Sequence, residues 1–76
     1  MNIELSQAFG SIVREKRIEL KLSQEELAFK AGLHRTYIGM IERGEKNITI
    51  ENINKIATAL DSSILELFLQ IENNKG

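Results

Sequence analysis

The sequence contains no cysteine, proline or tryptophan, and each absence narrows what the chain can be. Without cysteine, neither a disulfide nor a thiolate metal site can reinforce the small core that 76 residues form. The missing proline and the scarcity of aromatic residues favour helices. No apolar run approaches the ~18 residues that would span a bilayer. We therefore expect one soluble domain, residues 1–76, that is stabilised by helix packing or by a partner subunit.

Charge of either sign is not in excess, because the formal net charge is only -1 at pH 7. A strongly basic nucleic-acid binder would carry more positive charge, but DNA responds to the face presented to it rather than to the total. Residues 14–47 hold eight Lys or Arg and six Asp or Glu, whereas residues 48–76 hold two and four. The positive bias therefore lies in the middle of the chain.

The usual machinery of catalysis is missing from the sequence. An enzyme would need a nucleophile with a base, a paired acid and base, or a metal cluster, and this chain has one histidine. The five glycines are dispersed and do not form a phosphate-binding loop. We expect no enzymatic activity, no metal and no cofactor. The N-terminus lacks a basic segment followed by an apolar block, which predicts a cytoplasmic protein with no membrane partner.

Apolar residues recur mostly at intervals of three or four, which predicts five helices joined by short connections. The first helix is predicted from Ser6 to Lys21. The second begins at Ser23, which is placed to form a capping box with Glu26. Gly32 stands where this helix should end, because glycine adopts the left-handed conformation without a Cβ penalty. A tight turn between two helices is expected there.

Polar residues also mark the limits of the other three predicted helices. The third has His34 at its N-cap and should end at Gly44. Thr49 is placed to cap the fourth, and Ser62 or Ser63 the fifth, which is expected over about 63–72. The tail from residue 73 to residue 76 is expected to fray.

Residues 23–43 have the pattern of a helix-turn-helix motif. Such a motif needs a small residue where its helices cross, a glycine at the turn, and apolar residues at fixed offsets. The residues that meet these needs are Leu27, Ala28, Gly32, Leu33, Ile38 and Ile41. The second helix of the pair should then present its outer face to the major groove of DNA.

The outer face of that recognition helix carries the candidate base contacts, which are His34, Arg35, Thr36 and Met40, with Gly39 beside them. Arg35 is the best candidate, because its fork of donors can engage O6 and N7 of one guanine. The alternative for Arg35 is a solvated surface side chain. For His34, a plain N-cap is the favoured interpretation and a contact with DNA the other.

A second set of residues can donate hydrogen bonds to phosphates on both sides of the groove: Gln24, Tyr37, Arg43, Lys46 and Asn47. Such contacts would position the protein without specifying a DNA sequence. For Lys46 and Asn47 the alternative is an ordinary polar loop.

The stretch SQEELAFKAGLHRTYIGMIERGEKNITIENINKIATAL resembles the Cro/C1-type (XRE-like) helix-turn-helix family, and the likeness continues to Leu67 and Phe68. Within that family, HRTYIGMIERGEKNITI is similar to the controller proteins of bacterial restriction-modification systems. The resemblance implies an all-α, lambda-repressor-like domain of five helices, with the motif formed by helices 2 and 3. It also implies that Arg17 pairs with Glu42, so that neither residue reads DNA.

The same resemblance implies what the protein does. Controllers of this kind bind double-stranded operator DNA as dimers and regulate their own gene and the endonuclease gene, with RNA polymerase as a further candidate partner. The alternatives are a phage-type or developmental repressor, and an antitoxin-like regulator whose last helix engages a different protein.

The last predicted helix is apolar around more of its circumference than one small core can bury. The residues expected at a homodimer interface are Ile64, Leu65, Leu67, Phe68, Leu69 and Ile71. The alternative is that this helix merely closes the core of the monomer. Two copies related by a twofold axis would place their recognition helices about 34 Å apart, which matches successive major grooves.

Overall fold

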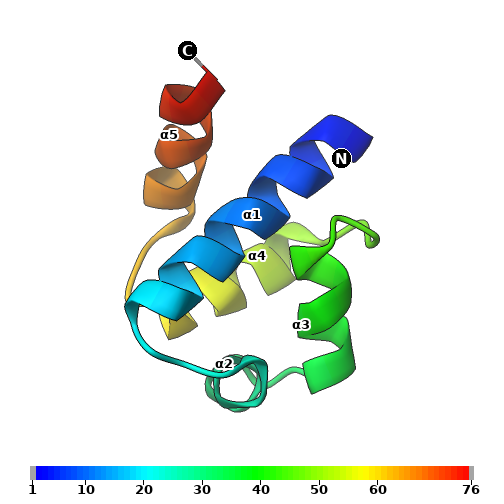
Figure 1. Cartoon of the computed structure of the whole chain (residues 1–76), viewed down its shortest axis with the longest axis vertical. Coiled ribbons are helices and arrows are strands. Elements are labelled where there is room, and N and C mark those ends of the chain that lie inside the picture. The colour runs from blue at the N-terminus through cyan, green and yellow to red at the C-terminus, as the bar shows by residue number, and fades with distance from the viewer. Residues whose placement is uncertain (1, 76) are drawn as a thin grey trace.

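The structure is a computed structural model that describes residues 2–75, and over this range every regular element is a helix. The helices are α1 (Ile3–Glu19), α2 (Gln24–Ala31), α3 (Arg35–Glu42), α4 (Ile50–Ala59) and α5 (Ile64–Lys75). In Figure 1, α1 crosses the molecule diagonally in front of α4, and α3 and α5 lie at opposite sides. The all-α fold with a helix-turn-helix at α2 and α3 is confirmed.

Side-chain caps determine where several helices begin. The Oγ atoms of Ser23 and Ser63 and the Oγ1 atom of Thr49 each accept a hydrogen bond from the backbone N–H three residues later. Ser63, rather than Ser62, therefore caps α5. The capping box at Ser23 is complete, because Glu26 Oε1 accepts from the Ser23 N–H at 2.8 Å. Each cap satisfies an N–H that has no partner inside its helix.

Three predicted helix limits were wrong: the start and the end of α1, and the end of α5. α1 ends at Glu19 with Leu20 as its C-cap, before the predicted Lys21. α1 begins at Ile3 and not at Ser6, because the Oδ1 of Asn2 accepts from the Leu5 N–H at 2.8 Å and caps the helix earlier. α5 continues to Lys75 instead of fraying from residue 73. Residue 76 of the expected frayed tail lies outside the described residues.

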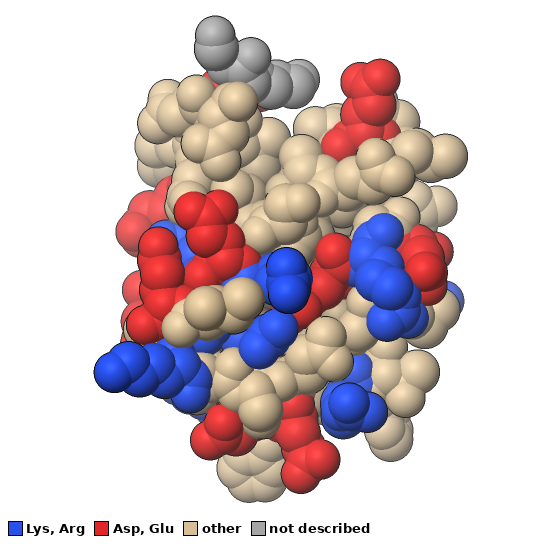
Figure 2. All heavy atoms as spheres, viewed as in Figure 1, with Lys and Arg blue, Asp and Glu red and all other residues tan. Residues whose placement is uncertain are grey.

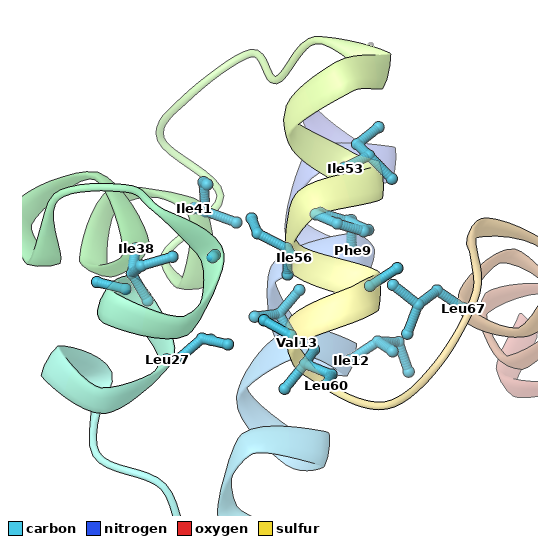
Figure 3. Packing of buried hydrophobic residues seen from close by; sticks show 14 of the residues in the cluster. Phe9, Ile12, Val13, Leu27, Ile38, Ile41, Ile53, Ile56, Leu60 and Leu67 are labelled. Atoms are coloured by element: carbon cyan, nitrogen blue, oxygen red, sulfur yellow. The ribbon is translucent and has the colours of Figure 1, made fainter.

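The core is centred on α1 and α4 (Figure 3). Phe9 and Val13 of α1 pack with Ile56 of α4, and all three side chains are almost fully buried. On one side of this centre lie the apolar residues of α2 and α3, and on the other lies Leu67 of α5. The helix-turn-helix therefore shares one continuous core with the rest of the molecule.

The turn between α2 and α3 follows the expected local chemistry. Gly32 has a φ of 70°, in the left-handed region, and the following Leu33 N–H donates to the Ala28 carbonyl at 2.9 Å. The Gly32 N–H also donates to the Phe29 carbonyl, at 3.2 Å. The two hydrogen bonds satisfy carbonyl groups at the end of α2 and set the direction in which the chain continues to α3. Over the described residues, none of the helices has the length and apolar character needed to cross a membrane.

Candidate nucleic-acid interface

The inner face of α3 is fixed by packing. Ile38 and Ile41 are buried, with 0% and 2% of their surface exposed. Gly10 of α1 lies directly beneath the end of α3, where an added Cβ would overlap the Ile41 carbonyl oxygen and lie 2.8 Å from that of Glu42. The backbones of α1 and α3 thus approach as closely as only glycine permits.

A polar network then ties α3 to α1 and α2. Arg17 Nε donates to Glu42 Oε2 at 2.7 Å, and Arg17 Nη1 donates to the Leu22 carbonyl at 2.8 Å. Gln24 Nε2 also donates to Glu42 Oε1, at 3.1 Å. The ion pair implied by the resemblance is therefore present, and it carries Gln24 as an additional donor.

Burial makes this network important for stability. Only 12% of the Arg17 side chain and 3% of the Glu42 side chain are exposed. The hydrogen bond from Arg17 to Glu42 holds the pKa of the guanidinium above its ordinary value, although burial acts in the opposite direction. Removing one partner of such a pair costs about 3–5 kcal/mol, because the other charge is left buried without compensation.

The exposed start of α3 brings together three of the four predicted base contacts. His34, Arg35 and Thr36 are all exposed, and Met40, one turn further, is half-buried. His34 occupies the N-cap position, but its side chain makes no capping hydrogen bond. The favoured interpretation of His34 as a plain cap therefore holds for its backbone position only, and its imidazole is not engaged in a cap.

The expectation that Gly39 lies on the exposed face of α3 was wrong. It is buried, because the side chains of Gln24 and Arg43 extend over it. An added Cβ would lie 3.2 Å from Arg43 Nη1 and 3.8 Å from Gln24 Oε1. The small residue lets these two polar side chains come close to the helix surface.

The five predicted phosphate contacts lie around the exposed row of His34, Arg35 and Thr36. They differ in how far other groups of the protein hold their side chains. Lys46 and Asn47 are exposed in the loop after α3. Arg43 Nε donates to Glu45 Oε2 at 3.0 Å, and both side chains are more than half exposed. An exposed pair of this kind contributes about 0–1 kcal/mol, so Arg43 can leave it at little cost.

Tyr37 and Gln24 are more constrained. Both are half-buried, and Gln24 is held through its amide nitrogen by Glu42. The Tyr37 hydroxyl accepts a hydrogen bond from Asn52 Nδ2 of α4 at 3.1 Å. Their functional atoms are therefore held in place before any ligand arrives.

Charges are mixed over the visible surface, in agreement with the near-zero net charge. Figure 2 shows basic side chains at the right, over α3 and the loop that follows it, with acidic side chains beside them, and further basic side chains at the centre and at the left. A ligand attracted to this side would meet local positive charge rather than one extended basic face.

The six apolar residues of α5 differ in how much of their surface is exposed. Leu67 and Ile71 are 0% and 5% exposed and already belong to the monomer core, so they have almost no surface to offer a partner. Leu65 and Leu69 are 66% and 51% exposed, and Ile64 and Phe68 are half-buried. The prediction that all six form a dimer interface therefore needs correction, and four remain candidates.

Sequence reasoning missed several residues that shape this site. Gly10 had no assigned role, and only the crossing of α1 and α3 explains it. Asn52 lies 15 residues beyond Tyr37, with no spacing rule to connect the two. Outside this site, Phe29 on α2 is 88% exposed, which helical spacing alone does not reveal.

Comparison with known proteins identifies the class to which this fold and site belong. Residues 13–67 match the helix-turn-helix family, and the chain belongs to it. This is a family of DNA-binding transcription regulators and not of enzymes.

Among its relatives are control proteins of restriction-modification systems. Control protein C.BamHI of Bacillus amyloliquefaciens is 53% identical over 53 residues, which cover 68% of this chain and 65% of that protein. The crystal structure of the restriction-modification controller C.AhdI from Aeromonas hydrophila is 51% identical, with a TM-score of 0.81 over 83% of this chain and 96% of that one. The controller C.Esp1396I, solved as a tetramer with its natural 35 base-pair operator, is 33% identical, with a TM-score of 0.85 over 91% of each chain.

Proposed function

We propose that this chain is a sequence-specific DNA-binding regulator of transcription, of the restriction-modification controller type. It would bind operator DNA as a homodimer and regulate its own gene and the endonuclease gene, in the cytoplasm. The observation that carries the proposal is the exposed row of His34, Arg35 and Thr36 at the start of α3. The other face of α3 is locked by Ile38 and by the buried pair of Glu42 with Arg17.

The arrangement suits major-groove recognition for a physical reason. Side chains that read bases must be held on a rigid element, because each misplaced contact weakens discrimination between base pairs. Arg35 is exposed on such an element, and Arg43 at the end of α3 and Lys46 in the following loop add exposed positive charge. Under this proposal, Arg35 and Thr36 read base edges, and Arg43 and Lys46 contact phosphates.

The finer assignment to controllers is supported by the relatives. C.BamHI and C.AhdI are both more than half identical to this chain where they align with it. C.Esp1396I binds its operator as a tetramer, which supports an oligomeric regulator here. The partly exposed α5 face provides a surface through which two copies can associate.

The test is a binding titration of the purified protein with the DNA upstream of its own gene, at several salt concentrations. Scrambled DNA of equal length and single base-pair substitutions serve as competitors. We expect tight binding in dimer-sized steps that is lost on the scrambled DNA. Equal binding to both would contradict sequence-specific recognition.

Two variants separate the roles of the arginines. Arg35→Ala should relax preference at one base pair, with a loss of about 10- to 100-fold on the preferred sequence. Arg43→Ala should weaken binding to all sequences alike and lower the slope of log affinity against log salt by about 1. A uniform loss for Arg35→Ala would show that it contacts phosphate and reads no base.

A further inference from the structure

Tyr37 and Asn52 form a side-chain link between α3 and α4. The Tyr37 side chain is half-buried and packs against the core, which leaves its ring little freedom. Its hydroxyl oxygen accepts a hydrogen bond from Asn52 Nδ2 at 3.1 Å. Asn52 itself is half-buried in the first turn of α4, where its backbone N–H donates to Thr49 Oγ1 at 3.1 Å.

The direction of this hydrogen bond determines what the Tyr37 hydroxyl can still do. A phenolic hydroxyl has one hydrogen to donate and two lone pairs to accept with, whereas the amide nitrogen of asparagine only donates. Because Asn52 occupies one lone pair, the hydroxyl hydrogen must point away from the amide nitrogen. Asn52 therefore converts a rotating hydroxyl into a donor with a preferred direction.

The surroundings of this donor suit an anionic acceptor. The loop between α3 and α4 carries exposed Lys46 and Asn47. The first turn of α4, which contains Asn52, is the positive end of that helix dipole. The acidic side chains of this segment, Glu45 and Glu51, are paired with Arg43 and Lys55. A DNA phosphate approaching from this side would meet the charge of Lys46, a helix N-terminus and the directed hydroxyl.

We propose that Asn52 is a positioning residue for DNA binding, which directs the Tyr37 hydroxyl to donate its hydrogen bond to a backbone phosphate. This inference rests on the proposed function. Asn52 acts through Tyr37 and needs no contact of its own with DNA. It pre-orders the donor before binding, so that less freedom is lost when the phosphate arrives.

The first test is a double-mutant cycle on operator affinity, measured by fluorescence anisotropy at one salt concentration. Tyr37→Phe should weaken binding about tenfold, because the hydrogen bond to phosphate is lost. Asn52→Ala should weaken binding about threefold, because the hydroxyl is present but undirected. In the Tyr37→Phe background, Asn52→Ala should have no further effect, because there is no hydroxyl left to direct.

A second variant reverses the hydrogen bond. In Asn52→Asp, the carboxylate accepts the Tyr37 hydroxyl hydrogen and removes it from the phosphate, so affinity should fall at least as far as in Tyr37→Phe. Asn54→Asp is the matched control, because it places the same charge at an exposed position of α4. It should weaken binding much less than Asn52→Asp does.

Melting curves of each variant accompany the titrations. Unchanged melting with coupled losses supports the inference. Independent losses for Asn52→Ala and Tyr37→Phe would overturn it, and so would an Asn52→Asp variant that binds like the control. If the unaltered protein bound its upstream DNA no better than scrambled DNA, the proposed function itself would fail, which is a separate result.

Discussion

At the scale of single residues, the site depends on residues that lack a side chain and on a side chain that is already hydrogen-bonded within the protein. Gly10 and Gly39 carry no side chain, and this absence lets backbone or polar groups approach α3 closely. Glu42 is the opposite case, since it accepts hydrogen bonds from both Arg17 and Gln24 while almost fully buried. These residues contribute to function by holding α3 in place.

Replacing Gly10 tests this close approach. Gly10→Ala would stabilise an ordinary helix interior by about 1 kcal/mol. Here the added Cβ overlaps the backbone oxygen of Ile41, which cannot move aside as a flexible side chain would. We expect a net destabilisation of about 2–3 kcal/mol, seen as a melting temperature lower by about 10–20 °C.

The matched control for this substitution is Ser11→Ala, which alters an exposed position of the same helix. Its melting temperature should stay close to that of the unaltered protein. A Gly10→Ala variant that melts at or above the original temperature would show that α1 and α3 can separate without cost.

At the scale of elements, capping side chains determine where the short helices begin. An eight-residue helix such as α2 is marginal by itself, so its ends matter. The capping box satisfies two backbone N–H groups at once, because the Ser23 N–H donates to the Glu26 carboxylate and the Glu26 N–H donates to the Ser23 hydroxyl. It thereby orients the first helix of the motif. The stability of this element should therefore depend on the charge of Glu26.

The backbone N–H of Ser23 donates to Glu26 and lowers the pKa of that carboxyl below its ordinary value of 4.5. A carboxyl whose pKa is lowered in the folded state stabilises the protein at pH values above the ordinary pKa of that carboxyl. This contribution is lost as the pH falls through the lowered pKa. Glu26→Gln should therefore reduce the loss of stability between neutral pH and pH values below 4.5.

Urea melts at a series of pH values, performed on Glu26→Gln and on Glu25→Gln, measure this effect. Glu25 lies in the same turn of α2 and is exposed, but it is not part of the capping box. The acid dependence should flatten in the Glu26 variant more than in the Glu25 variant. Identical curves for the two would mean that the capping box contributes nothing that depends on pH.

At the scale of the whole molecule, α3 and α5 lie at opposite sides of one shared core (Figure 1). α5 contributes Leu67 and Ile71 to that core and leaves Leu65 and Leu69 exposed. A homodimer formed through this exposed face would leave both copies of α3 free for DNA. Two half-site contacts would then act together, which strengthens binding without any new contact per copy.

The double variant Leu65→Glu/Leu69→Glu tests this association. Two charges on the exposed face should convert the proposed dimer to a monomer, because burying them without partners is costly. Sedimentation or light scattering measures the mass, and Thr58→Glu on the exposed side of α4 is the control for added charge. A double variant that remains dimeric would place the interface elsewhere, for example near the exposed Phe29.

Local information in the sequence determined the number of helices, the cap at Ser23, the turn at Gly32 and the exposed row that begins at His34. Caps and turns depend on residues three or four positions apart, so a linear pattern records them. Only the tertiary structure decided that Gly10 lies beneath α3, that Asn52 holds Tyr37, and which face of α5 stays exposed. Each of these depends on contacts between helices distant in the chain, and helical periodicity does not say which neighbour covers an apolar or polar side chain.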